Sequence, residues 1–74
     1  MIQFVKFATL DPEGFALIRL DDISSFSEST TEGTCMLITK HNNFLIKGTV
    51  DYHIENMRNF IGGEWDAVPE EQVL

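Results

Sequence analysis

The sequence predicts an α+β domain, in which a small curved antiparallel sheet or half-open barrel of four or five strands is followed by one helix and an acidic tail. Short runs rich in β-branched and aromatic residues alternate with turn residues up to residue 47. A stretch with helical spacing follows only after residue 49. At 74 residues the chain makes one domain with a thin core, assigned to residues 1–63, and a tail at residues 64–74.

The first two predicted strands cover residues 1–9 and 15–20. Apolar residues stand on both faces of the first strand, which indicates a central or bulged strand. Between the strands, Asp11 and Pro12 set a turn, and Gly14 is free to take a positive φ. The two strands should therefore form a hairpin.

A break follows the second strand. Asp21 and Asp22 interrupt the extended pattern, and we expect the chain to kink or bulge before Ile23 and Phe26 resume it. Adjacent side chains in an extended strand point to opposite faces, so the two carboxylates are not expected to converge on a cation. A polar loop then covers residues 27–34.

A second hairpin is predicted from strands at residues 35–40 and 44–47. His41 falls at the turn between them, and backbone geometry explains a polar residue there. Cys35 lies in an apolar strand, where burial raises the pKa of a thiol and makes it inert. We therefore expect neither residue to be catalytic.

The helix is expected to begin at Val50, with Thr49 as its N-cap, and to end at Gly62 and Gly63. His53 is expected on a solvated flank of this helix. The helical spacing predicts one apolar stripe against the sheet, formed by Val50, Ile54, Met57 and Ile61 with Phe60 beside it.

Charge limits the class of partner. Twelve acidic residues against five basic ones give a net charge of −7, which disfavours direct contact with nucleic acid or anionic membranes and favours a basic or apolar protein surface. No stretch has the length or pattern of a membrane span or of a cleaved leader. A single cysteine excludes an internal disulfide, and we expect a cytoplasmic protein.

The acidic tail is the leading candidate for partner binding. Trp65 either closes the small core or acts as an exposed anchor, since tryptophan is enriched at interface hot spots. The acidic residues that would steer it to a basic partner are Glu64, Asp66, Glu70 and Glu71.

A second candidate is a locally basic corner for an anion, formed by Lys40, His41, Lys47 and Arg58. A metal site is not expected, because one cysteine and two histidines show none of the ligand spacings of zinc sites. No cofactor is predicted, and no nucleophile, acid and base converge in the sequence.

The order of these signals resembles short bacterial and phage-encoded proteins of the flagellar FlbD-like type. The resemblance covers residues 1 to 61 and is carried by the opening Met1-Ile2, by residues 20–23 (LDDI), by residues 37–39 (LIT) and by residues 44–50 (FLIKGTV). It implies a small accessory protein without enzymatic activity, and it supplies no catalytic residues.

Two functions are compatible with these features. The first is a small acidic non-enzymatic binding protein that acts by protein–protein contact, as an accessory protein or a phage-type antagonist of a host macromolecule. The alternative is a homo-oligomer that binds a small anionic ligand such as a nucleotide. In both cases we expect self-association, because short sheets leave open edges and a thin core gains from a second subunit.

Overall fold

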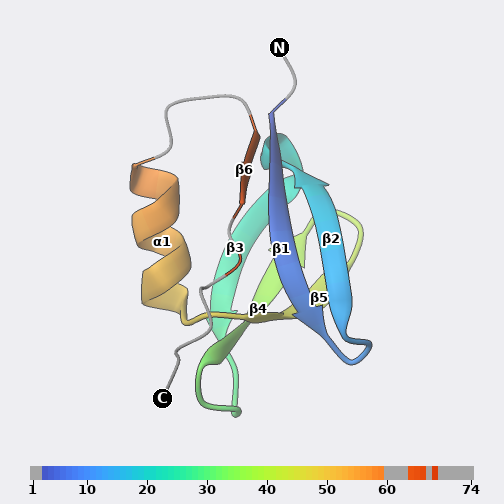
Figure 1. Ribbon diagram of the computed structural model, residues 1–74, viewed down its shortest axis with the longest axis vertical. Coiled ribbons are helices and arrows are strands. Elements are labelled where there is room, and N and C mark those ends of the chain that lie inside the picture. The colour runs from blue at the N-terminus through green and yellow to red at the C-terminus, as the bar shows by residue number, and fades with distance from the viewer. Residues whose placement is uncertain (1–2, 60–63, 67, 69–74) are drawn as a thin grey trace.

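A computed structural model describes residues 3–59, 64–66 and 68, and shows a five-strand antiparallel sheet followed by one C-terminal helix (Figure 1). The predicted α+β class is confirmed. The sheet is neither closed nor strongly curled, so the half-open barrel is not the form adopted. The elements are β1 (Phe4–Leu10), β2 (Gly14–Arg19), β3 (Ile23–Glu28), β4 (Thr34–Thr39), β5 (Asn43–Lys47), α1 (Val50–Arg58) and a short β6 (Glu64–Asp66).

Strand β1 joins the two parts of the sheet, whose order is β2-β1-β5-β4-β3. On one edge β1 pairs with β2 along six residues. On its other edge, Thr9 and Leu10 pair with Ile46 and Leu45 of β5, whereas Phe4–Lys6 pair in parallel with β6. Of the two predicted alternatives, a central or a bulged first strand, the central one is formed.

The β1–β2 turn is closed by residues that favour local hydrogen bonds. Thr9 Oγ1 donates to the carbonyl of Pro12 over 3.1 Å. The left-handed residue is Asp11, with φ of 56°, and not Gly14 as predicted. Aspartate tolerates this conformation because its short polar side chain can bond to nearby backbone.

The predicted break after β2 is a single 3-10 turn over Leu20–Asp22, and the pairing of β3 with β4 shifts register between Ile23 and Ser25. Arg19 binds Asp21 across this turn at 2.9 Å. The hydrogen bond from Arg19 lowers the pKa of Asp21, with desolvation acting in the opposite direction. The carboxylate of Asp21 is thus paired locally with Arg19 and remains solvated.

The β4–β5 turn is closed by the backbone N–H of Thr39, which donates to the carbonyl of Asn42 over 2.9 Å, and by the Thr39 hydroxyl. Thr39 Oγ1 accepts hydrogen bonds from the backbone N–H of Asn42 at 2.9 Å and of His41 at 3.3 Å. The side chain of His41 is exposed in this turn. Its place is explained by the turn, as the sequence indicates.

The core lies between the sheet and α1. Alternate residues of β1, β4 and β5 supply its fully buried apolar side chains, because successive strand residues face opposite sides. These are Val5, Phe7, Cys35, Leu37 and Ile46. Partly buried residues packed against them are Ile18, Leu20, Ile23, Phe26, Phe44 and Val50.

Helix α1 begins at Val50 as predicted, and Thr49 Oγ1 accepts a hydrogen bond from the N–H of Tyr52 over 3.1 Å. It ends at Arg58. The predicted helix end at Gly62 and Gly63 lies outside the described residues, as do Phe60 and Ile61.

The face that α1 turns to the sheet differs from the predicted stripe. Ile54 is 40% exposed, whereas His53, expected on a solvated flank, is 1% exposed. His53 Nε2 donates to the carbonyl of Lys47 over 2.7 Å, and its ring stacks on Phe26 with centroids 5.3 Å apart. The ring also lies 5.5 Å from that of Phe7. His53 takes the buried position in place of Ile54 because its imidazole packs on Phe26 and also donates a hydrogen bond to the carbonyl of Lys47.

Protonation of His53 is disfavoured in the fold. Since a carbonyl only accepts, the proton of the neutral ring is assigned to Nε2, and Nδ1 has no hydrogen-bond partner among the described residues. Burial lowers the pKa of His53, and the hydrogen bond to Lys47 opposes this shift. The unfolded chain therefore binds a proton at a higher pH than the folded chain does.

Replacement of the helix cap should lower stability. Thr49→Ala removes the acceptor for an otherwise unpaired helical N–H, so we expect the free energy of unfolding to fall by about 1 kcal/mol in urea melts. Thr49→Ser keeps the hydroxyl and should stay close to the parent. Equal losses in both variants would contradict a capping role.

The stability of the protein should depend on pH through His53. Because the folded-state pKa lies below the unfolded value of about 6.5, the free energy of unfolding is expected to fall as the pH is lowered from about 7.5 to about 5, with a slope of at most about 1.4 kcal/mol per pH unit. His53→Gln should lose this dependence, and His41→Gln should keep it. Thermal melts of the parent and of the two variants across this pH range measure the dependence. A parent protein that is equally stable at every pH would contradict the lowered pKa of His53.

Candidate functional site

The predicted partner-binding tail joins the sheet at its first residues. The backbone of Glu64–Asp66 forms β6, and the register sets Trp65 opposite Val5 of β1. Glu70 and Glu71 lie outside the described residues. Binding of a partner by the tail stays a prediction.

The predicted anion corner is not assembled. Lys40 and His41 lie at the β4–β5 turn, but Lys47 stands at the opposite end of β5, paired with Thr34. Each of the two remaining cations faces a carboxylate: Lys47 Nζ lies 3.9 Å from Glu13, and Arg58 lies 3.6 Å from Glu55 on α1. The extended residues of β5, Asn43–Lys47, lead away from the turn, and this places Lys47 far from Lys40.

Among the described residues, side chains that could hold a metal ion together are not grouped. No cluster of three His, Cys, Asp or Glu side chains forms in that part of the chain. Cys35 is fully buried, and burial, with a smaller effect of the Glu28 carboxylate, raises the pKa of its thiol to about 11. Over the same residues, no helix has the length and hydropathy needed to cross a membrane.

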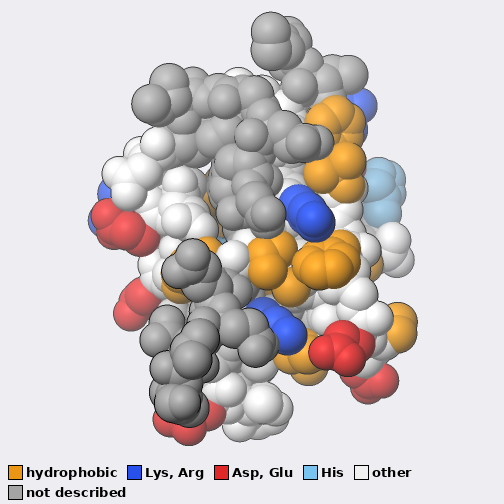
Figure 2. Space-filling model, in the orientation of Figure 1, with side chains coloured by type: hydrophobic (Ala, Val, Ile, Leu, Met, Phe, Trp, Pro, Cys, Tyr) orange, Lys and Arg blue, Asp and Glu red, His pale blue; other side chains and the backbone are white. Residues whose placement is uncertain are grey.

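An apolar surface missed by the sequence reasoning lies on the outer side of the β1–β2 hairpin. Phe15 is 66% exposed and Leu17 is 54% exposed, since Ala16 and Ile18 of the same strand face the core. Lys6 extends from β1 and places its Nζ 4.5 Å from the centre of the Phe15 ring. Figure 2 shows hydrophobic side chains next to Lys and Arg side chains over this hairpin. We call Phe15, Leu17 and Lys6 the hairpin face.

The hairpin face continues into a shallow recess. A cavity of about 310 Å³ lies beside Phe15 and is lined by Ala8, Glu13, Lys47 and Val68 among others. Ala8 is only 3% exposed although the register places it on the same face as Phe15. The recess thus presents apolar surface with one ion pair at its rim, which suits a protein side chain.

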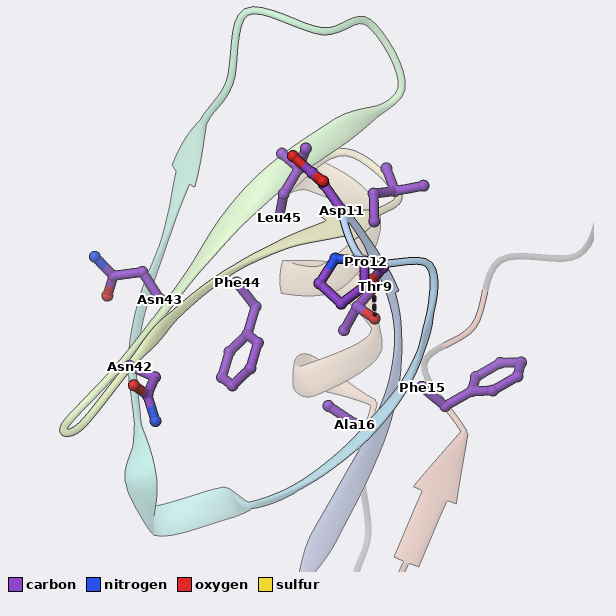
Figure 3. A pocket seen from close by; sticks show the side chains of 10 residues that line it. Thr9, Asp11, Pro12, Phe15, Ala16, Asn42, Asn43, Phe44 and Leu45 are labelled. Atoms are coloured by element: carbon purple, nitrogen blue, oxygen red, sulfur yellow. Dashed lines mark hydrogen bonds between the residues drawn. The ribbon is translucent and has the colours of Figure 1, made fainter.

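A second cavity, of about 380 Å³, opens between the tips of the two hairpins (Figure 3). Phe44 and Ala16 point toward it, whereas Phe15 points away to the outside. Asp11 is the charged residue among those that line it, with Asn42 and Asn43 at one side. A negatively charged ligand such as a nucleotide is therefore disfavoured there.

Strand β2 is also an edge strand. Within the described residues it pairs with β1 alone. The N–H of Leu20 donates to the carbonyl of Gln3 over 2.8 Å, and in an antiparallel ladder hydrogen-bonded pairs alternate with non-bonded ones. Leu20 and every second residue before it therefore bond to β1, and the backbone N–H and C=O groups of Phe15, Leu17 and Arg19 face the open edge.

The other edge strand, β3, is better protected against pairing. Its exposed positions are serines and a glutamate, namely Ser24, Ser25, Ser27 and Glu28. It carries the register shift, and α1 packs against it. Polar side chains, bulges and covering helices are the usual protections of sheet edges, so β2 is the less protected edge of the two.

Comparison of the chain with protein-family models, with curated proteins and with solved structures found no match. The resemblance to the flagellar FlbD-like type therefore stays a prediction.

The buried thiol should be unreactive in the folded protein. Because Cys35 is fully buried and its pKa is raised to about 11, we expect iodoacetamide near neutral pH to modify it far more slowly in the native chain than in guanidinium chloride. Mass spectrometry over time measures both rates. Similar rates in the two conditions would contradict the inert assignment.

Proposed function

We propose that this chain is a small non-enzymatic binding protein that acts by contact with another protein through the hairpin face. One observation carries the proposal: Phe15 and Leu17, two large apolar side chains of one edge strand, are exposed side by side. Burying such side chains in a partner removes apolar area from water, which favours association by about 25 cal/mol per Å² before entropic losses.

The chemistry of the hairpin face supports a protein partner. Phe15 is an aromatic anchor, and the ammonium of Lys6 over its ring supplies a polar rim. Arg19, next along the exposed side of β2, is of the type enriched at interface hot spots. The separation of Lys40 from Lys47 removes the arrangement on which the anion-binding alternative depended.

Overall charge favours a basic or apolar partner surface. The net charge of −7 would steer a basic protein toward the chain and repel polyanions at long range. The acidic tail with Trp65 is retained as a second contact region in this proposal. We also propose a cytoplasmic location, because the single cysteine is free and buried.

Loss of the exposed apolar side chains should weaken partner binding. For the double variant Phe15→Ser, Leu17→Ser we expect affinity for a partner recovered with the parent chain to fall roughly tenfold or more, as for hot-spot truncations. Calorimetry with the purified partner gives the measurement. Both side chains are exposed, so unfolding by urea should show little loss of stability.

Ile54→Ser is the matched control. Ile54 is also an exposed apolar residue but lies on α1, away from the hairpin. It should bind as the parent does. Unchanged affinity of the double variant, or equal losses in the double variant and the control, would contradict the proposed surface.

A further inference from the structure

We propose that a second copy of this chain pairs with the open edge of β2, in antiparallel orientation about a two-fold axis at Ala16. The inference rests on the proposed function and deepens it, because it names a partner for the same hairpin. It follows from the free backbone groups of β2 and from the order of residues along it.

The backbone of β2 is suited to this pairing. The N–H and C=O groups of Phe15, Leu17 and Arg19 face the open edge, as the hydrogen bond from Leu20 to Gln3 establishes. In the two-fold arrangement, Phe15 and Leu17 of one copy exchange hydrogen bonds with Leu17 and Phe15 of the other. The strand Gly14–Arg19 contains no proline, so each edge position keeps its donor.

The side chains select the register. With the axis at Ala16, Phe15 lies opposite Leu17 of the second copy, which pairs the two most exposed apolar side chains. Glu13 then lies opposite Arg19 of the second copy, which gives two symmetric pairs of opposite charge. An axis at Leu17 would instead set Glu13 opposite Asp21, a pair of like charges.

The charged side chains are free to take part. Glu13 is 79% exposed and Arg19 is 48% exposed, and their present partners, Lys47 and Asp21, are also solvent-accessible. Because exposed pairs contribute little, reorientation of either side chain is easy. An interface in which the same patch meets itself is the rule for two-fold dimers.

Other occupants of this edge fit less well. A strand from an unrelated protein would need its own acid and base in the same two positions. A second copy supplies both by symmetry. The pairing also places the two hairpin faces side by side, so that Phe15 and Leu17 of both copies form one apolar surface for a further partner.

The first test is the mass of the protein in solution. Sedimentation equilibrium of the full chain from about 1 μM to about 1 mM should show a shift from 8.4 kDa toward twice that mass. A mass that stays at one chain up to the highest concentration overturns the inference. The proposed function still stands in that case if the double variant Phe15→Ser, Leu17→Ser binds the recovered partner more weakly than the parent does.

Charge reversal tests the register. Glu13→Arg sets two arginines face to face, Arg19→Glu sets two glutamates face to face, and each should raise the dimer dissociation constant roughly tenfold. The combined variant restores opposite charges and should recover the parent value. Glu32→Arg and Lys40→Glu make the same changes in net charge at exposed positions outside β2 and serve as controls.

The single variants separate local pairing from overall repulsion. Glu13→Arg reduces the net negative charge and Arg19→Glu increases it, so overall repulsion alone would make the first variant a stronger dimer. A Glu13→Arg variant that dimerises more tightly than the parent overturns the proposed register. So does a combined variant whose dimer dissociation constant is as high as those of the single variants.

Hydrogen exchange provides a measurement that needs no variant. The amides of Phe15, Leu17 and Arg19 should exchange more slowly as the protein concentration rises, whereas amides of β3 should not change. Protection that appears only after a different protein is added would assign the edge to that protein and overturn self-pairing.

Discussion

The structure depends on how strand β1 divides one of its edges between two partners. β2 follows the whole of the opposite edge, but β5 meets β1 only at Thr9 and Leu10, and β6 takes Phe4–Lys6. A strand placed in this way needs apolar residues on both faces, and Val5 and Phe7 face the core while Ala8 is buried on the other side. The apolar residues on both faces at the start of the sequence therefore reflect the central place of β1 in the sheet.

Two further features determine which side chains are exposed and which are buried. Among the described residues β2 pairs with β1 alone, which leaves β2 as an edge strand with its outer face exposed. At the end of β5, the carbonyl of Lys47 accepts the hydrogen bond of His53, and this fixes the rotation of α1. The chain thus buries an imidazole beneath the helix and leaves Phe15 in solvent, the reverse of what hydrophobicity alone suggests.

Features set by neighbouring residues could be predicted from the sequence, and features set by distant ones could not. The hairpin turns, the break at Asp21 and the cap at Thr49 each depend on a few adjacent residues. The burial of His53 depends on Lys47 and Phe26, which lie on two strands, and helical spacing alone favoured Ile54. The basic corner failed for a local reason, because the extended strand β5 separates Lys40, in the turn before it, from Lys47 at its far end, and the predicted hairpin already contained this separation.

The hairpin face was missed because its signal is ambiguous in sequence. Residues 15–20 are apolar on both faces, a pattern expected of an interior strand, and only the topology shows that β2 has a single neighbour. β2 has apolar side chains on both faces, but one of its edges has no neighbouring strand and its outer face is not covered by another element among the described residues. Under the proposed function the same residues satisfy both needs, because pairing at the edge completes the ladder of Phe15, Leu17 and Arg19 and the face receives the partner. In this proposal the charge of −7 would act at long range on which proteins approach, and the apolar contact would determine which remain bound.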